Sequence, residues 1–197
     1  MARSVPEDIA SIPHWARVAF AARCSRNVLP LFERFWPDAE PRRREPLLSA
    51  TRLAERSAQE GRPAPGLKDA IVGSVTTAGA ALLPTYGMSS GDEPLPAGEH
   101  ACHVASFAAK SAEWAANAAR EAPSGSADAA LEAYTWARDA AHAAEAVDVL
   151  ARLRGDFAGL VRVATRGRWA DDTPVPPSLF ELLAEDSDEK PWWAFWR

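Results

Sequence analysis

The chain has 197 residues, of which 47% are hydrophobic and 25% are charged, and its formal net charge is -5. This length suits one domain with its own core, and the composition is that of a globular protein, not of a disordered chain. The negative charge argues against a general nucleic-acid binder, which needs a basic face for phosphate contacts. The one dense basic run, Arg42 to Arg44, is expected to be the solvated first turn of a helix.

Cysteine usage and hydropathy suggest the compartment. Cys24 and Cys102 are too few for a disulfide framework, and each lies among alanines in a helical pattern. We expect free, buried thiols in a reducing cytosol. The N-terminal segment lacks the apolar core of a signal peptide, and no stretch approaches the roughly 18 apolar residues that a membrane span needs. The sequence therefore predicts a cytoplasmic protein with no membrane span.

The first half of the chain carries three helical patterns. Over 13–36, apolar residues at steps of three, four or seven residues form one stripe: Trp15, Val18, Ala22, Leu29, Phe32 and Trp36. Pro30 is expected to kink or divide this helix near Asn27, because proline removes a backbone donor and clashes with the preceding turn. A second helix is expected over about 42–60, with Gly61 as its stop. Its inner face carries Leu47, Thr51, Ala54 and Ala58.

The third pattern, over 67–83, follows a breaker-rich linker. The residues expected to face inward are Leu67, Ile71, Val75, Ala78 and Leu82. Glycines and β-branched residues weaken this helix. The segment 84–98 is the longest loop, and we interpret it as a connection inside one domain, because neither half of the chain offers many large apolar residues.

Alanine dominates the second half. The helix predicted within 97–122 has one smooth face of small apolar residues, Ala101, Val104, Ala105, Ala108, Ala112 and Ala115. A second face carries His100, His103, Phe107 and Trp114. Apolar groups on two faces are typical of a central helix, and small residues let neighbouring helices approach closely.

Two further helices are expected before the chain changes character. One begins behind the serine and aspartate cap signal at 124–128 and turns inward Leu131, Tyr134, Ala137 and Ala141. The other ends near Gly167 and holds Val147, Leu150, Phe157, Leu160, Val161 and Ala164. The predicted fold is an all-α, single-domain helical bundle of six to eight helices over 1–168.

The residues 169–197 are predicted to form a C-terminal tail. It comprises a proline-rich extended strap, a short helix from Ser178 through Leu183, an acidic spacer and an aromatic end. The aromatic residues are Trp192, Trp193, Phe195 and Trp196, whose burial would contribute several kcal/mol at about 25 cal/mol per Å². This end can fold back on its own domain, dock on a sister subunit or another protein, or touch a membrane surface. The acidic spacer disfavours an anionic membrane.

A histidine-rich segment is the one candidate for metal binding. His100 and His103 are three residues apart on a helix, with Cys102 beside them, and Asp139 and His142 have the same spacing on another helix. His14 or Cys24 could add a ligand. However, the ligand spacing of zinc ribbons and the paired Glu-x-x-His signature of di-iron bundles are both absent. We therefore expect no metal and no other cofactor. A small metal-binding or cofactor-binding helical-bundle enzyme that uses His100, His103 and His142 is the alternative.

Enzyme motifs are also missing. The sequence has no nucleophile elbow, phosphate loop or dinucleotide fingerprint, all of which need strand-to-helix turns. We therefore assign no catalytic residue and expect a protein that is not an enzyme.

A family resemblance gives the expected role. Residues 13–38 and the alanine-rich segments 100–119 and 134–146 resemble the all-helical immunity proteins of bacterial toxin systems. This resemblance implies a helical domain that neutralises a toxin by binding it. The segment "WADDTPVPPSLFELL" also resembles a motif of uncharacterised bacterial proteins. We expect a bacterial immunity or adaptor protein that binds a protein partner or forms a homo-oligomer, with Trp192, Trp193, Phe195 and Trp196 in contact with the partner.

Overall fold

The computed structural model describes residues 8–88 and 94–180, which form helices and no strand. The long helices are α2 (His14–Phe35), α3 (Pro41–Glu60), α4 (Leu67–Leu82), α5 (Glu99–Arg120), α6 (Pro123–Ala143) and α7 (Val147–Gly167). Two short 3-10 helices, η1 (Ile9–Ser11) and η2 (Leu83–Tyr86), precede α2 and follow α4. The prediction of an all-α helical bundle is confirmed.

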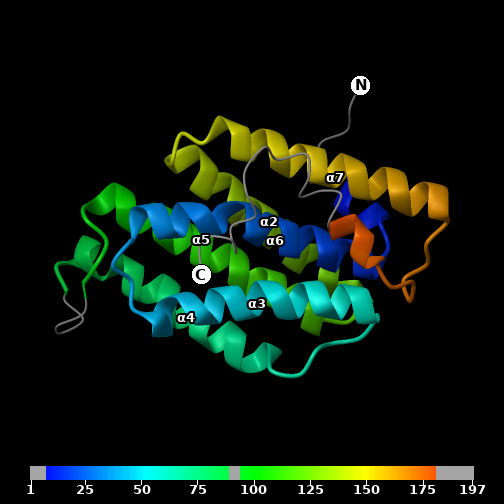
Figure 1. The fold of residues 1–197 in the computed structure, drawn as a ribbon, viewed down its shortest axis with the longest axis horizontal. Helices are drawn as coiled ribbons and strands as arrows, with labels where there is room; N and C mark the ends of the chain where they lie inside the picture. Colours follow the sequence, from blue (N-terminus) through cyan, green and yellow to red (C-terminus); the bar gives the residue numbers. More distant parts are fainter. Residues whose placement is uncertain (1–7, 89–93, 181–197) are drawn as a thin grey trace.

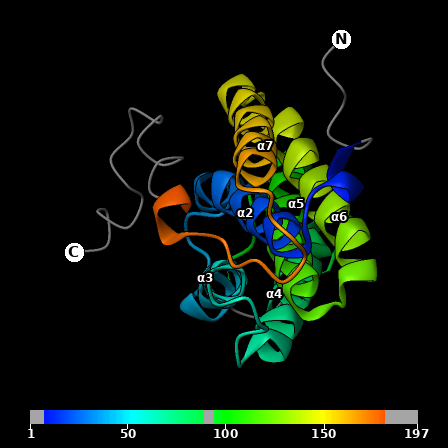
Figure 2. The ribbon, with the colours of Figure 1, turned by 90° about the vertical axis from the view of Figure 1, so that its right-hand side faces the viewer.

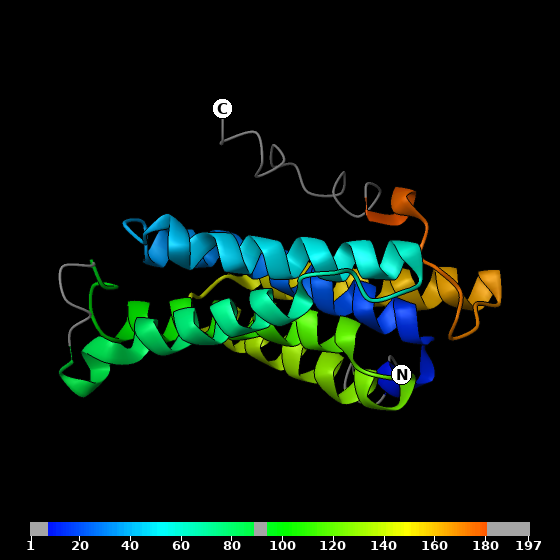
Figure 3. The same ribbon diagram turned by 90° about the horizontal axis from the view of Figure 1, so that it is seen from below.

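Two helices form the centre of the bundle (Figure 1). α2 packs against α3, α5, α6 and α7, while α5 packs against α2, α3, α4 and α6. The end-on view in Figure 2 shows α7 and α4 at opposite sides of the molecule, so each has one broad face turned away from the bundle. Figure 3 shows that the long helices run roughly along one common direction.

Small side chains explain how α5 fits between its neighbours. The six small apolar residues predicted on its smooth face are all buried, and the alanines at 109, 116, 118 and 119 are buried as well. Alanine adds little width to a helix, so the axes of neighbouring helices can come closer than usual. The predicted central position of this helix is therefore confirmed.

Pro30 does not divide the first long helix. α2 is one continuous α-helix from His14 to Phe35 with Pro30 inside it. Pro30 itself is exposed, whereas the residues around it are almost all buried. A proline inside a helix costs about 3 kcal/mol. Packing on nearly every side of α2 offsets that cost, because the burial of a single large apolar side chain contributes about 1.5–3 kcal/mol.

The inward face predicted for the third helix is wrong in part. Leu67 and Ala78 are buried as expected, but Val75 is exposed, and Ile71 and Leu82 are only partly buried. The residues that α4 turns inward are mostly small or hydroxylic: Ala70, Ser74, Thr77, Ala80 and Ala81 join Leu67 and Ala78. Close packing against α3 and α5 selects these residues by size.

The helix α6 also begins earlier than predicted. It starts at Pro123, with Ala122 at the cap position, and no side chain caps it. Proline suits the first helical position, where a missing N–H costs nothing, and this placement takes the serines at 124 and 126 into the first turn.

The strap that follows α7 packs on the bundle. The Val175 N–H donates to the Ala58 carbonyl at 2.8 Å, and the His14 N–H donates to Asp171 Oδ1 at 2.7 Å. Val175, Leu179 and Phe180 are buried in the same core as the helices. A helix begins at residue 177, near the expected Ser178, and the rest of the predicted tail lies outside the described residues.

Candidate functional site

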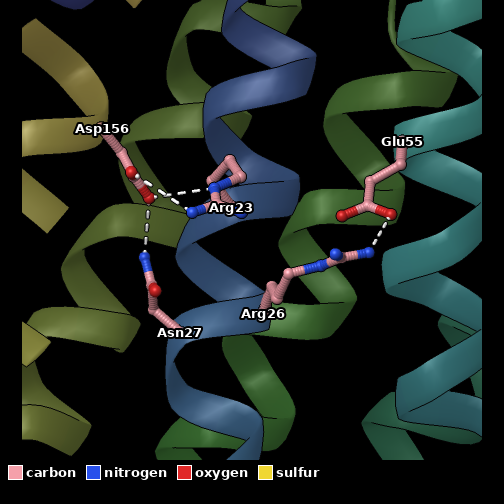
Figure 4. A network of polar contacts seen from close by, with 5 residues as sticks. All are labelled: Arg23, Arg26, Asn27, Glu55 and Asp156. Atoms are coloured by element: carbon pink, nitrogen blue, oxygen red, sulfur yellow. Dashed lines mark hydrogen bonds and ion pairs between the residues drawn. The ribbon is translucent and has the colours of Figure 1, made fainter. Parts of the chain in front are cut away.

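A buried ion pair joins α2 to α7. Arg23 Nε lies 3.0 Å from Asp156 Oδ2, and the Asn27 side-chain amide donates to the same oxygen at 2.8 Å (Figure 4). The side chains of Arg23 and Asp156 are only 5% and 7% exposed. A carboxylate with this many donors and so little access to water is suited to fixing the position of α7, and not to receiving a substrate.

A second charged contact joins α2 to α3 on the other side of α2 (Figure 4). Arg26 donates to Glu55 Oε2, and the hydroxyls of Ser25 and Thr51 lie 2.6 Å apart in the same helix interface. Burial raises the pKa of Glu55, and the positive charge of Arg26 opposes that rise. The two polar contacts therefore attach α2 to α3 on one side and to α7 on the other.

The histidines proposed as metal ligands are not brought together. His100 is exposed, with its ring 5.4 Å from the ring of Phe35, and His103 lies 3.6 Å from the Glu99 carboxylate. On α6, Asp139 accepts a hydrogen bond from Arg138, and His142 is exposed. The described residues contain no group of three or more His, Cys, Asp or Glu side chains that could hold a metal ion.

The two thiols are buried and free, as predicted. Burial raises the pKa of Cys24 well above its ordinary value, and the nearby Asp156 carboxylate raises it further. Burial also raises the pKa of Cys102, whose thiol lies 3.8 Å from the Pro96 carbonyl. Both thiols therefore stay protonated near neutral pH, and a thiol in this form is a poor nucleophile and a poor metal ligand.

A small hollow lies where the entrance to α2 meets the end of α7. Its volume is about 190 Å³, and it is lined by Ser11, Ile12, Pro13, Val161, Ala164, Thr165, Arg168 and Trp169. Pockets for small organic ligands usually enclose about 300 Å³ or more. The hollow is therefore too small to define a substrate site.

The outer surface of α4 and η2 is the feature best suited to recognition. Val72 is 57% exposed and Val75 46%, and beyond the helix Tyr86 is 72% exposed and Met88 58%. Gly79 is exposed between them on the same side of α4. We call these five residues the α4 face. Exposed large apolar residues gathered on one element mark interaction sites more often than scattered ones do.

Packing on the inner side of α4 forces these valines outward. An added Cβ at Gly73 would lie 2.5 Å from the Pro46 side chain, so only glycine fits where α4 crosses α3. Thr77 donates its hydroxyl to the Gly73 carbonyl and to the Arg43 carbonyl of α3, and Ser74 is fully buried. Because the small and hydroxylic residues fill this tight contact with α3, Val72 and Val75 lie on the opposite, solvent-exposed side of α4.

The α4 face also carries no charge. Residues 70–88 contain no Asp, Glu, Lys, Arg or His, although a quarter of the whole chain is charged. A solvated helix face normally carries charged residues, and their absence keeps the desolvation cost of a contact low. The α4 face can therefore be buried against an apolar surface of another protein.

Sequence reasoning missed this surface because it placed Val75 inward. The uncharged run of residues 70–88 was a signal that could have found it. A stretch of surface helix without charged side chains, such as residues 70–82, must expose apolar or small residues, whichever side faces the core. Trp192, Trp193, Phe195 and Trp196, predicted to contact a partner, lie outside the described residues.

Comparison with known proteins identifies no relative of this chain. No family model, curated protein or solved structure matches it. In the described part of the chain, none of the helices combines the length and the apolar character needed to cross a membrane.

Proposed function

We propose that this chain is a protein-binding helical domain, and that the α4 face is its contact surface. The observation that carries the proposal is the exposure of Val72, Val75, Tyr86 and Met88 within the uncharged segment 70–88. Among the described residues, the two buried charged contacts join helices, and the histidines do not converge on one site. A binder needs only a surface of this kind, whereas an enzyme needs converging polar groups in a pocket.

The biological role that we propose is that of a bacterial immunity or adaptor protein in a toxin or defence system. Its support is the resemblance of the aromatic and alanine patterns in α2, α5 and α6 to all-helical immunity proteins. Two protonated, unlinked thiols are compatible with the cytoplasm, where we place the protein. The aromatic residues from Trp192 to Trp196 are proposed as a second contact with the partner.

A photo-crosslinking amino acid at position 72 tests the proposal in bacterial cells. We expect a covalent adduct with another polypeptide chain, because the side chain at this position points into the proposed interface. The matched control carries the crosslinker at Arg154, which is exposed on α7 at the opposite side of the bundle. The change Val75→Asp should abolish the adduct at position 72, since a charge would have to be buried in an apolar contact.

The outcome is measured as adduct yield by denaturing electrophoresis, and mass spectrometry identifies the captured chain. Equal yields at positions 72 and 154, or an adduct that persists with Val75→Asp, would show that the α4 face is not a binding surface. The triple change of Trp192, Trp193 and Trp196 to alanine in the same assay measures the contribution of the aromatic residues. Loss of the adduct in that variant, with the thermal melt unchanged, is the expected result.

A further inference from the structure

The exposed side of α4 is complementary to itself. Steps of three or four residues separate Lys68, Val72, Val75, Gly79 and Leu82 of α4 and Tyr86 of η2, and all of them except the half-buried Leu82 are exposed. The members of this series lie at equal distances from position 77, so that an antiparallel copy would place Lys68 against Tyr86, Val72 against Leu82 and Val75 against Gly79. Steps of three and four residues are the spacing that lets two helices pack along their length.

The central pair fits by shape. A Cβ added at Gly79 would meet no atom within 4 Å, so the surface is open at this position. Val75 is one turn away and 46% exposed, so it projects from the same side. A projecting valine on one helix and an open glycine on the other allow two helices to approach closely. Because both residues occur on one stripe, the contact would form twice about a twofold axis.

The charges favour the same pairing. Two copies that each carry a net charge of -5 would repel one another over most of their surfaces, but residues 70–88 are uncharged. At each end of the stripe the exposed Lys68 would meet the exposed ring of Tyr86, a pairing of an ammonium group with an aromatic face. The antiparallel arrangement thus buries no like charges.

We propose that the occupant of the α4 face is a second copy of this chain, bound through antiparallel α4 helices with Val75 of one copy over Gly79 of the other. This inference rests on the proposed function, because it names the partner that the α4 face binds. The 16 residues of α4 extend about 24 Å at 1.5 Å per residue. An interface made by one helix of this length from each copy is small beside the roughly 1,200–2,000 Å² that stable complexes bury. We therefore expect a dimer that dissociates on dilution.

The test is a dilution series of the full chain by sedimentation velocity or light scattering. The wild-type protein should change from dimer to monomer as it is diluted. Gly79→Val should be monomeric throughout the series, because its side chain fills the space that Val75 of the other copy needs. Gly155→Val is the matched control, since Gly155 is also an exposed helical glycine with no atom near an added Cβ, but lies on α7. This control should dimerise like the wild type.

An exchange of the two residues makes the test specific for this register. The double variant Val75→Gly/Gly79→Val has the same composition as the wild type and restores one valine opposite one glycine. It should recover the dimer that Gly79→Val loses. A monomeric wild-type protein at every concentration, a dimeric Gly79→Val variant, or a folded exchange variant that stays monomeric would each overturn the proposal.

A disulfide measurement keeps the proposal testable where the exchange variant fails to fold. Val75→Cys and Gly79→Cys variants, mixed under mild oxidation, should form a covalent dimer faster than either variant alone, because only the mixture places a cysteine at position 75 opposite a cysteine at position 79. Equal rates in the three samples would overturn the proposal. A monomeric wild type whose position 72 still crosslinks to a different protein overturns the dimer alone, whereas a monomer with no adduct at position 72 overturns the proposed function as well.

Discussion

At the scale of single residues, Asp156 is a charged group in the interior, and its carboxylate needs hydrogen-bond partners there. It accepts hydrogen bonds from Arg23 and Asn27 of α2 and is almost completely shielded from water. The desolvation of two charges can cost as much as their attraction gains, so the pair is weak evidence for net stability. Removing only one partner of the ion pair is destabilising, because the other charge then stays buried without a partner.

We predict that Asp156→Leu lowers the free energy of unfolding by about 3–5 kcal/mol. The double variant Arg23→Met/Asp156→Leu should be more stable than Asp156→Leu, because no unpaired charge then remains in the interior. Urea unfolding of the wild type, both single variants and the double variant gives the coupling between the residues. Additive losses in the double variant would show that the two side chains act independently.

Glu55 should make stability depend on pH. Burial raises its pKa in the folded protein, so the folded state binds a proton more readily than the unfolded state does. Stability therefore falls as pH rises from the ordinary pKa of glutamate, about 4.5, through the raised pKa of Glu55. Glu55→Gln should flatten this part of the profile, which is measured as the difference between the two unfolding curves across pH 4–8. A constant difference between the two proteins over that range would contradict the assignment.

At the scale of helices, α4 contains a matched pair of glycines with opposite surroundings. An added Cβ at Gly73 would lie 2.5 Å from Pro46, whereas one at Gly79 meets nothing within 4 Å. Gly79→Ala should stabilise the monomer by up to about 1 kcal/mol, because alanine is the better helix former. Gly73→Ala should destabilise it, because α3 and α4 must separate to make room. Thermal melts of dilute samples measure both, and the same sign of shift in the two variants would refute this view of the packing.

The helices also show what sequence periodicity can establish. The extent of α3 and the burial of its inner residues Leu47, Thr51, Ala54 and Ala58 followed from the pattern, since the charged residues Glu45, Arg52 and Arg56 mark the exposed side of the helix. After Lys68 and Asp69, α4 has no charged residue to mark its solvent side, and the inward position predicted for Val75 from periodicity alone is wrong. The contact of Gly73 with Pro46 decided that orientation, and such a contact between distant residues is invisible in a local pattern. The candidate surface was missed for the same reason. The continuity of α2 through Pro30 also depends on contacts with other helices, which a local pattern does not show.

At the scale of the whole molecule, the strap after α7 connects parts of the chain that are far apart in sequence. Asp171 holds the backbone at the start of α2, and Val175 bonds to the end of α3. Pro174 packs beside Gly61, whose φ of 64° lets the chain turn sharply out of α3. The sequence predicts a tail over 169–197, yet Val175, Leu179 and Phe180 share the core of the bundle. Prolines and turn residues predicted an extended strap but not its docking site.

This docking predicts that the strap unfolds together with the bundle. Leu179→Ala should lower the global free energy of unfolding by about 2–5 kcal/mol, the usual cost of truncating a buried leucine. Val147→Ala is the control, because Val147 is 74% exposed and should change stability by less than about 0.5 kcal/mol. The urea transition of Leu179→Ala should stay single and keep its slope, because the strap and the helices bury one continuous surface. If the strap instead opened independently, Leu179→Ala would increase hydrogen exchange of the Val175 amide while the global transition stayed in place.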